Sequence, residues 1–407
     1  PVLGPLLVLA AMVLLGLISL PFGSSLTSQA GAEKWASRGL LGELVQRTGL
    51  DTARVGEAII GCVTQAGEQA GNVGKIAALE AGWSDSVSVA TVNHYCASSL
   101  YALHLAAARV ACGDELAVAG GVESMSRVPM ASDQPPFIVD PATVQRLGAP
   151  PMGVGADGIA TLHGITREDA EAYAVQSQQR AARARQAGHF SRALVPVHGA
   201  DGRVLLADDE TIRPGASVEK LLAMAPFFAE MGAQWADALL RARHPELGPV
   251  NHFHHAGNSP AMADGASITL LGSESAARSL KVPPRARLLA TASHADDHVL
   301  ALNGALGATH KALRRAGLAV HDVDLWEVNE AFAAPTLHFM RQLGIDPDRF
   351  NVNGGAIALG HAMGATGTTL VGMLADELTR RGQRRGVAAV SGALGLGAAV
   401  VIEMVVA

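Results

Sequence analysis

Two stretches that lie far apart in the chain follow the same order of residue patterns. Residues 59–121 read IIGCVTQAG … VATVNHYCASSLYALHLAAARVACGDELAVAGG, and residues 324–390 read DLWEVNEAFA … NVNGGAIALGHAMGATGTTLVGMLADELTRRGQRRGVAAV. Each contains an apolar run typical of a strand, a reactive side chain at a helix start, a helix of about 15 residues and a further strand. This repetition predicts a duplicated α/β domain in which strands and helices alternate.

The segment between the two stretches has a different character. Residues 125–255 contain proline-rich turns and a strongly helical stretch that begins after Thr166, a plausible cap, with Glu168 and Asp169 in its first turn. We expect this segment to lie over the active-site face. The predicted organisation is an apolar N-terminal extension with a first strand over 1–22, a first half over 23–124 and 256–281, a loop domain over 125–255, and a second half over 282–407.

The N-terminal stretch is uncharged, and the first lysine is Lys34. Its uninterrupted apolar part, residues 6–20, is shorter than the roughly 18 residues that indicate a membrane span. It also lacks the basic region of a secretory signal peptide. We therefore expect a strand over about 13–20 preceded by an apolar extension, while membrane contact through residues 2–20 is the less favoured alternative.

Charge and cysteine content exclude several classes of protein. The net charge is −6 and the basic residues are dispersed, which argues against a nucleic-acid surface. The basic clusters at 180–185 and 380–385 are expected on solvated helix faces. Three cysteines are too few and too scattered for a disulfide framework or a zinc site, which favours a reducing, cytoplasmic compartment. Cys62 and Cys112 lie in apolar runs, where we expect small buried side chains.

The third cysteine, Cys96, lies between a strand-like run over 86–92 and a helical pattern over 98–111. A helix N-terminus lowers the pKa of a thiol, and its free N–H groups can stabilise an oxyanion. His361 lies in a second glycine-rich stretch before a helix, and Asn329 follows the apolar strand DLWEV. A thiol, an imidazole base and an amide that can hold a water or a carbonyl make a workable acyl-transfer site.

The motifs around these residues resemble those of the thiolase family. They are N-H-Y-C-A-S from Asn93, GGVESMS from Gly120, NEAF from Asn329, GGAIALGHAMGATG from Gly354 and SGALGLG from Ser391. The match runs from about residue 50 to the end and looks most like bacterial acetyl-CoA acetyltransferases of the fatty-acid oxidation type. The resemblance implies a five-layer αβαβα core of two duplicated halves with an inserted loop domain. It further implies a homodimer or homotetramer with no bound cofactor, and an acyl-CoA or acyl-carrier thioester as substrate.

The resemblance also assigns roles to individual residues. Cys96 would be acylated, His361 would activate it and help to bind the thioester oxygen, and Asn329 would anchor a water in that oxyanion hole. The position of the family's second catalytic cysteine, which handles the α-proton of the incoming acyl-CoA, is occupied by Ser391. Contacts with the substrate or coenzyme A are implied for Met152, Gln178, Ser259, Ala393 and Gly395.

The departures from the family pattern fall mainly on one part of the site. A serine hydroxyl is a far weaker acid than a thiol and needs a base of its own. Ala393 and Leu394 stand where the family has glycines, Ala362 where it has proline, and Pro260 where it has a serine that contacts coenzyme A. The acylation half of the site is therefore kept, while the half that handles a carbanion is changed.

These observations lead to one functional prediction and two alternatives. We expect an acyltransferase that forms an acyl-enzyme on Cys96 and passes the group to an acceptor, with ordinary Claisen condensation impaired. The first alternative is a working acetyl-CoA acetyltransferase or 3-ketoacyl-CoA thiolase that uses Ser391. The second is a non-catalytic scaffold subunit, against which the retention of Cys96, His361 and Asn329 argues.

Other polar residues in these motifs are expected to have structural roles. Glu123 and Glu330 would hold loops by hydrogen bonds. Four histidines, at 94, 252, 254 and 255, fit no common zinc spacing and are expected in the core or on the surface rather than at a metal.

Overall fold

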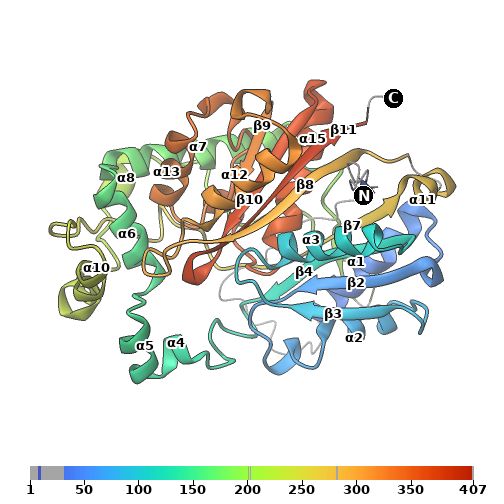
Figure 1. Ribbon diagram of the computed structural model, residues 1–407, viewed down its shortest axis with the longest axis horizontal. Helices are drawn as coiled ribbons and strands as arrows, with labels where there is room; N and C mark the ends of the chain where they lie inside the picture. The colour runs from blue at the N-terminus through green and yellow to red at the C-terminus, as the bar shows by residue number, and fades with distance from the viewer. Residues whose placement is uncertain (1–7, 11–31, 200, 202, 281–282, 406–407) are drawn as a thin grey trace.

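The computed structural model describes residues 8–10, 32–199, 201, 203–280 and 283–405 (Figure 1). The strand expected over about 13–20 lies outside the described residues, as does most of the apolar N-terminal stretch. The described part of that stretch is the strand β1 (Val8–Ala10). Within the described ranges, no helix is both long enough and apolar enough to cross a membrane.

Nine strands pair in the order β3-β2-β4-β7-β1-β8-β11-β10-β9. The first half of this sheet and its helices consist of β1, α1 (Ala32–Thr48), β2 (Val55–Gly61), α2 (Val73–Glu80), β3 (Ser88–Val92), α3 (Ser98–Ala111), β4 (Leu116–Ser124), β7 (Asp264–Ser273) and α11 (Glu274–Ser279). The second half consists of β8 (Ala286–Ala295), α12 (Gly304–Ala316), β9 (Leu325–Val328), α13 (Ala333–Gln342), α14 (Ala356–Leu359), α15 (Thr366–Arg381), β10 (Arg385–Ser391) and β11 (Leu396–Met404).

The two halves repeat one strand arrangement, which confirms the predicted duplication. In the first half, β2 lies between the parallel strands β3 and β4, and β4 pairs antiparallel with β7. In the second half, β10 pairs parallel with β9 and antiparallel with β11. An isolated parallel bridge between Trp326 and Phe350 occupies the place that corresponds to β3. The first strands of the two halves, β1 and β8, pair with each other.

The two halves of the sheet are two of the five expected layers, and the helices form the other three. Helices α1 and α2 pack on strands of the first half, and α12 packs on strands of the second half. Helices α3 and α15 contact strands of both halves and each other, so they form the middle layer. The chain therefore has the predicted α/β class with an αβαβα core.

Local sequence patterns account for the middle-layer helix α3. It covers the predicted residues 98–111, and its buried side chains recur at helical spacing, with Leu100, Leu103 and Val110 facing the core. The following strand, β4, is buried along its whole length, as its unbroken run of apolar and small residues predicts. Because α3 packs on β2 and β4, the position of its first turn is fixed by these strands.

Between β4 and β7, the chain forms mostly short helices. These are α4 (Pro136–Val139), α5 (Pro141–Leu147), α6 (Met152–Leu162), α7 (Arg167–Gln186), α8 (Val218–Leu222), α9 (Ala229–Met231), a π-helical turn (Gly232–Ala236) and α10 (Asp237–Arg243), with the hairpin β5 (Val197–His198) and β6 (Val204–Leu206). Thr166 caps α7 in a capping box with Asp169, as the sequence predicts. Helices α6 and α7 pack against α13 of the second half, so this segment reaches across the molecule.

Two sequence expectations about single residues are wrong. Cys112 is exposed rather than buried, because it caps the C-terminal end of α3 on the side that faces solvent. Arg180, expected on a solvated helix face, is buried. Its guanidinium donates to the carbonyls of Phe350, at 2.7 Å, and Pro347, at 2.9 Å. A long-range partner that the local pattern does not contain therefore decides its burial.

The contact between β4 and the loop before α15 leaves no room for a side chain at Gly121. A Cβ atom there would lie 2.0 Å from the carbonyl oxygen of Gly364. Because the obstructing oxygen belongs to the backbone of a packed loop, it cannot easily move away. We therefore expect Gly121→Ala to lower the free energy of unfolding by about 1–3 kcal/mol. The measurement is the thermal unfolding midpoint.

Gly39→Ala is the matched control for this substitution. Gly39 lies inside α1, with no atom within 4 Å of the added Cβ. This exchange should keep or raise the midpoint, because alanine is favoured over glycine in a helix by about 0.5–1 kcal/mol. Equal midpoints for Gly121→Ala and wild type would show that the two halves are not packed this closely.

Candidate active site

The turn that carries Cys96 is built by its own motif. Tyr95 has a left-handed backbone, with φ of 49°, and its N–H donates to Oδ1 of Asn93 at 2.9 Å. The Ser98 hydroxyl accepts from the N–H of His94 at 2.8 Å and donates to the carbonyl of Tyr95 at 2.5 Å. The first and last polar residues of the motif thus hold Cys96 immediately before α3.

The protonation state of Cys96 differs from the sequence expectation. Burial, followed by the charge of Glu123, raises the pKa of the thiol to about 12. The expected lowering of this pKa at the helix start is therefore wrong for the free protein, because burial outweighs the helix N-terminus. Cys96 rests as a thiol and must lose its proton during attack.

His361 is held in the state that a general base requires. It is buried, and its Nδ1 lies 2.8 Å from the Thr366 hydroxyl, which in turn donates to the carbonyl of Ala362 at 3.4 Å. This chain places the imidazole proton on Nδ1. Nε2 has no hydrogen-bonding partner among the described residues, and burial lowers the pKa of His361 to about 4. The side chain is thus neutral, with a free lone pair on Nε2.

Glu123 joins the loop after β2 to the loop that carries His361, and Asn93 of the Cys96 motif donates to the carbonyl of Val63 in the first of these loops at 3.1 Å. Its carboxyl oxygens accept the N–H groups of Val63 at 2.9 Å and Thr64 at 3.1 Å from the first half, and of Gly364 at 3.0 Å from the loop after His361. The side chain of Gln69 donates to it at 2.9 Å. The prediction that Glu123 holds loops by hydrogen bonds is confirmed.

The starts of α3 and α15 lie against each other. The N–H of Thr368 donates to the Ser99 hydroxyl at 3.1 Å, and a Cβ at Gly367 would lie 2.5 Å from the backbone nitrogen of Leu100. The structure therefore brings together the two helix starts that carry Cys96 and His361.

Asn329 and Glu330 follow β9 and have different roles. Asn329 is 5 % exposed, and neither its Oδ1 nor its Nδ2 meets a partner among the described residues. Glu330 accepts from the hydroxyls of Tyr173 and Ser177, each at 2.7 Å, and from the N–H of Ile357 at 3.0 Å. Glu330 thus holds loops, as predicted, and leaves the Asn329 amide available to a ligand.

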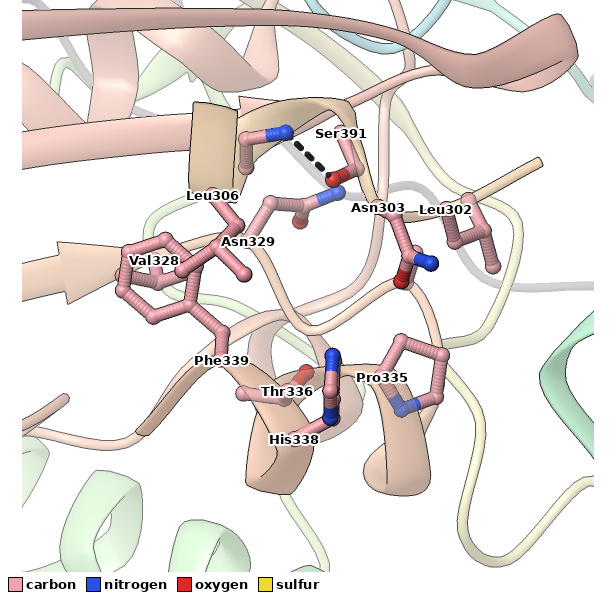
Figure 2. Close-up of a pocket in the computed structure, with 12 residues that line it drawn as sticks. Leu302, Asn303, Leu306, Val328, Asn329, Pro335, Thr336, His338, Phe339 and Ser391 are labelled. Atoms are coloured by element: carbon pink, nitrogen blue, oxygen red, sulfur yellow. Dashed lines mark hydrogen bonds between the residues drawn. The ribbon is translucent and has the colours of Figure 1, made fainter. Parts of the chain in front are cut away.

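Ser391 and Asn329 line one small cavity, which Figure 2 shows and which we call the Ser391 cavity. The Ser391 hydroxyl accepts the N–H of Ala305, at 3.0 Å, in the first turn of α12. The next residue, Gly392, adjoins the Cys96 turn, since a Cβ there would lie 3.5 Å from the backbone nitrogen of Cys96. Ser391, which lines the cavity, is thus one residue away from a glycine that packs on the turn that carries the thiol.

The glycine-rich loop after Ser391 keeps a backbone that favours glycine. Leu394 has φ of 55°, in the left-handed region, which costs a side-chain-bearing residue about 1–2 kcal/mol. Gly395 also has positive φ, and a Cβ there would lie 2.3 Å from the carbonyl oxygen of Asp296. Ala393 is buried in the same turn. The surrounding structure thus imposes the loop conformation despite the replaced glycines.

Three residues that the resemblance implies as coenzyme A contacts lie apart from the Ser391 cavity. The buried amide of Gln178 donates to the carbonyl of Ile357 at 3.0 Å and accepts from the N–H of Arg213 at 2.6 Å. Ser259 and Met152 are half-buried. Contacts of these residues with a substrate stay predictions.

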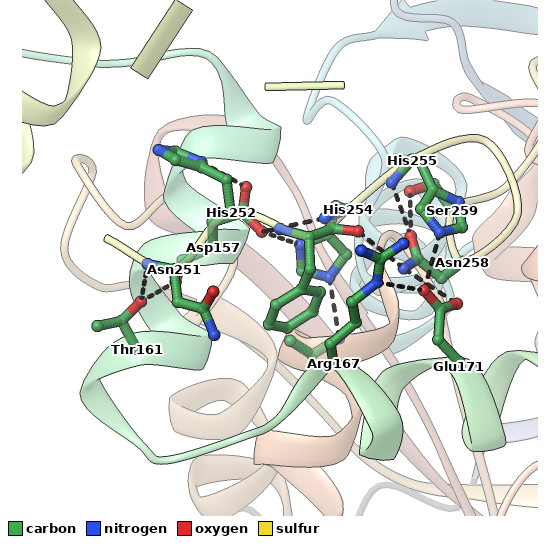
Figure 3. A network of polar contacts seen from close by, with 12 residues as sticks. Asp157, Thr161, Arg167, Glu171, Asn251, His252, His254, His255, Asn258 and Ser259 are labelled. Atoms are coloured by element: carbon green, nitrogen blue, oxygen red, sulfur yellow. Dashed lines mark hydrogen bonds and ion pairs between the residues drawn. The ribbon is translucent and has the colours of Figure 1, made fainter. Parts of the chain in front are cut away.

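The three histidines at 252, 254 and 255 contact carboxylates, as Figure 3 shows. His254 lies 2.6 Å from Asp157 and His255 lies 2.8 Å from Glu171, while the other ring nitrogen of each accepts a backbone N–H. The interpretation of these two as core histidines is confirmed. His252 joins Asp157 at 2.8 Å to Asp237 at 3.0 Å. In the described part of the chain, no group of three or more His, Cys, Asp or Glu side chains could hold a metal ion.

Three residues of the site were not predicted from the sequence. Thr366, which orients His361, lies inside a motif that the resemblance covered, so its hydroxyl could have been considered. Asn303 and His338 line the Ser391 cavity, but they lie outside those motifs. The only sign of His338 in the sequence is that a histidine occurs in the helix that follows the NEAF motif.

Comparisons with known proteins agree with this geometry. The family profile described as "Thiolase, N-terminal domain" matches residues 18–238, and that described as "Thiolase, C-terminal domain" matches residues 282–404. A beta-ketoadipyl-CoA thiolase of Pseudomonas aeruginosa is 37 % identical over 405 residues, covering 94 % of this chain and 96 % of that protein. A 3-ketoacyl-CoA thiolase of Aliivibrio fischeri is 35 % identical, covering 96 % and 99 %.

The fold is also that of a solved relative. The crystal structure of the Bacillus anthracis acetyl-CoA acetyltransferase superposes with a TM-score of 0.81 at 29 % identity, covering 99 % of this chain and all of that chain.

The raised pKa of Cys96 predicts how the free protein reacts with iodoacetamide. At neutral pH, the exposed Cys112 should be labelled before Cys96, and labelling of Cys96 should keep rising as the pH is raised well above neutral. Peptide mass mapping after timed exposure measures both rates, with Cys96→Ala as the control for assignment. Preferential labelling of Cys96, with a midpoint below pH 8, would instead show a thiolate preformed beside His361.

Proposed function

The chain belongs to the thiolase family, and from this premise we propose that it forms an acyl-enzyme on Cys96 and transfers the acyl group without efficient Claisen condensation. The donor is an acyl-CoA or an acyl-carrier thioester. The observation that carries the proposal is Ser391, a hydroxyl at the position of the second catalytic cysteine, which accepts its hydrogen bond from the start of α12.

The arrangement of Cys96, His361 and Asn329 supports the acylation step. As Cys96 Sγ attacks the thioester carbonyl, Nε2 of His361 takes the thiol proton, because both groups begin neutral. The Asn329 amide has a free N–H donor for an oxygen that gains negative charge. Collapse of the tetrahedral adduct breaks the carbon–sulfur bond of the donor, and the imidazolium returns the proton to the departing thiolate.

The surroundings of Ser391 support the loss of the second step. A cysteine here would lie at a helix N-terminus, where the dipole and the N–H of Ala305 stabilise a thiolate. A serine receives the same hydrogen bond but would have to lose a proton from a far weaker acid. Loss of a positioned base slows a reaction by about 10²–10⁴-fold, so removal of an α-proton should be correspondingly slow.

The relatives favour a second candidate, a working thiolase. Proteins named beta-ketoadipyl-CoA thiolase and 3-ketoacyl-CoA thiolase match this chain over nearly its whole length. On this reading, Ser391 supports the making or breaking of a carbon–carbon bond with the help of a base. The non-catalytic scaffold is disfavoured, because buried amide and imidazole atoms without partners at Asn329 and His361 suit a ligand.

Further features of the protein are proposed on the strength of the resemblance alone. They are a homodimer or homotetramer and the absence of a bound cofactor, with coenzyme A or a carrier entering only as part of the substrate. A cytoplasmic location is proposed from the cysteine content.

Intact-protein mass spectrometry tests the acylation step. After mixing with a panel of acyl-CoAs, the protein should gain the mass of one acyl group, and Cys96→Ala should gain none. If no acyl-CoA gives an adduct, the same assay with acyl-carrier protein decides between a carrier donor and a scaffold. A gain retained in Cys96→Ala would place the acyl group elsewhere.

Restoring the thiol tests the role of Ser391. Ser391→Cys should raise acetoacetyl-CoA formation from acetyl-CoA by about 10²-fold or more, since a thiolate at the start of α12 can act as the missing base. Ser391→Ala, which has neither group, is the matched control and should behave like the wild type. Condensation by the wild type that is fast and is lost in Ser391→Ala would support the working thiolase instead.

A further inference from the structure

The Ser391 cavity contains an unusual set of polar atoms for a small buried space. Asn303 Oδ1 and both amide atoms of Asn329 are buried and have no hydrogen-bonding partner among the described residues. Buried polar groups without partners are costly, because they lose their hydrogen bonds to water on folding. Their convergence on one cavity therefore indicates a polar ligand.

His338 lines the same cavity from α13. It is 7 % exposed, and Figure 2 shows its ring below Asn303 and Asn329, with one nitrogen on the side nearer to them. The ring stacks on His163 at a centroid distance of 3.8 Å, and its nitrogens are bonded to no group in the part of the chain that the structure describes. His338 thus presents a free ring nitrogen to the cavity.

The remaining walls decide what kind of molecule this cavity can accept. Apolar side chains, including Leu306, Val328 and Phe339, form much of the lining, and no carboxylate is among the lining residues. An alkylamine is protonated at neutral pH, and burying its charge here without a counter-charge is unfavourable. A neutral hydroxyl suits the site, because it can donate to a histidine nitrogen or to Asn303 Oδ1 and accept from Asn329 Nδ2.

We propose that His338 is the proton acceptor for a water molecule that attacks the acyl group on Cys96 from the Ser391 cavity. The cavity volume of about 10 Å³ is room for about one water molecule. The inference rests on the proposed acyl-enzyme and names its acceptor. Its geometric basis is that Ser391 lines the cavity while the adjoining Gly392 packs on the Cys96 turn.

The proposed step balances without any further reagent. The hydroxyl oxygen forms a bond to the acyl carbon as its proton passes to His338. The carbon–sulfur bond to Cys96 then breaks, which gives a carboxylic acid. The imidazolium of His338 returns the proton to the sulfur, directly or through His361.

Neighbouring groups keep His338 in the form that accepts a proton. Burial, followed by the charge of His163, lowers the pKa of His338 to about 4, while Asp296 acts in the opposite direction. The ring is therefore neutral at neutral pH. It is a weak base, but one that is never blocked by a proton from solvent in that range.

Single-turnover measurements separate this inference from the proposed function. The protein is acylated with acetyl-CoA, freed of coenzyme A, and followed by intact mass spectrometry in buffer alone and with a panel of short alcohols. His338→Ala should form the adduct at the wild-type rate but lose it about 10²-fold or more slowly. Added imidazole should restore the loss, because it can enter the space left by the side chain.

Two further variants serve as controls. His163→Phe keeps a ring stacked on His338 but removes a charge that lowers the pKa of His338, so its adduct should decay at neutral pH no more slowly than the wild-type adduct. His338→Phe fills the space, so imidazole should not restore decay.

The outcomes distinguish a failure of the role proposed for His338 from a failure of the proposed acyl-enzyme. Adduct decay in His338→Ala at the wild-type rate, or slow decay that imidazole leaves unchanged, would overturn the role of His338 while leaving the acyl-enzyme intact. No adduct in the wild type with any thioester donor would overturn both. Free acid as the product supports the proposal when decay depends on His338. An ester formed from an added alcohol would instead show that the acceptor enters from outside the Ser391 cavity and would overturn the proposal.

Discussion

The geometry of the site depends on the carboxyl group of Glu123. This side chain is 1 % exposed and receives N–H groups from the loop after β2 and from the loop between His361 and α15. Each half of the molecule contributes one part of the acylation apparatus. Glu123 links the loop after β2 directly to the His361 loop, and the Asn93 side chain connects the Cys96 turn to the same loop after β2. Leaving its buried donors without a partner would be costly, at about 1–3 kcal/mol for each group. Together with the bond from the Thr368 N–H to the Ser99 hydroxyl, this buried acceptor joins the two halves at the site.

Around this link, the site divides into a part that is complete and a part that is altered. Cys96 and His361 are both neutral, with a thiol proton and a free lone pair, which suits proton transfer during attack on a thioester. The position of Ser391 at the start of α12 would stabilise a negative charge, yet its hydroxyl is poorly able to supply one. The cavity beside it instead contains His338, which could activate a hydroxyl acceptor. Both features lie in the second half of the chain.

Local sequence patterns predicted much of this structure. Helix α3 begins and ends where its apolar spacing indicates, and α7 begins after the predicted cap at Thr166. The duplication and the motifs gave the layered core, because each motif lies at the end of a strand or the start of a helix. Properties that depend on distant parts of the chain were not predictable in this way. The burial of Arg180 depends on carbonyls about 170 residues later, and burial by both halves reverses the expected shift of the Cys96 pKa. The Ser391 cavity joins α12, α13 and the end of β10, so no local pattern could indicate it.

The central claim is that the site keeps the acylation step and lacks the step that forms a carbanion. Hydrogen exchange at the methyl group of acetyl-CoA tests this claim most directly. The protein is incubated with acetyl-CoA in D₂O, and the methyl protons are followed by NMR while the acyl-enzyme is monitored by mass. The account predicts that Cys96 becomes acylated while the methyl protons exchange no faster than with Cys96→Ala. Exchange well above that control would show that a base at the site removes α-protons, and would contradict the account.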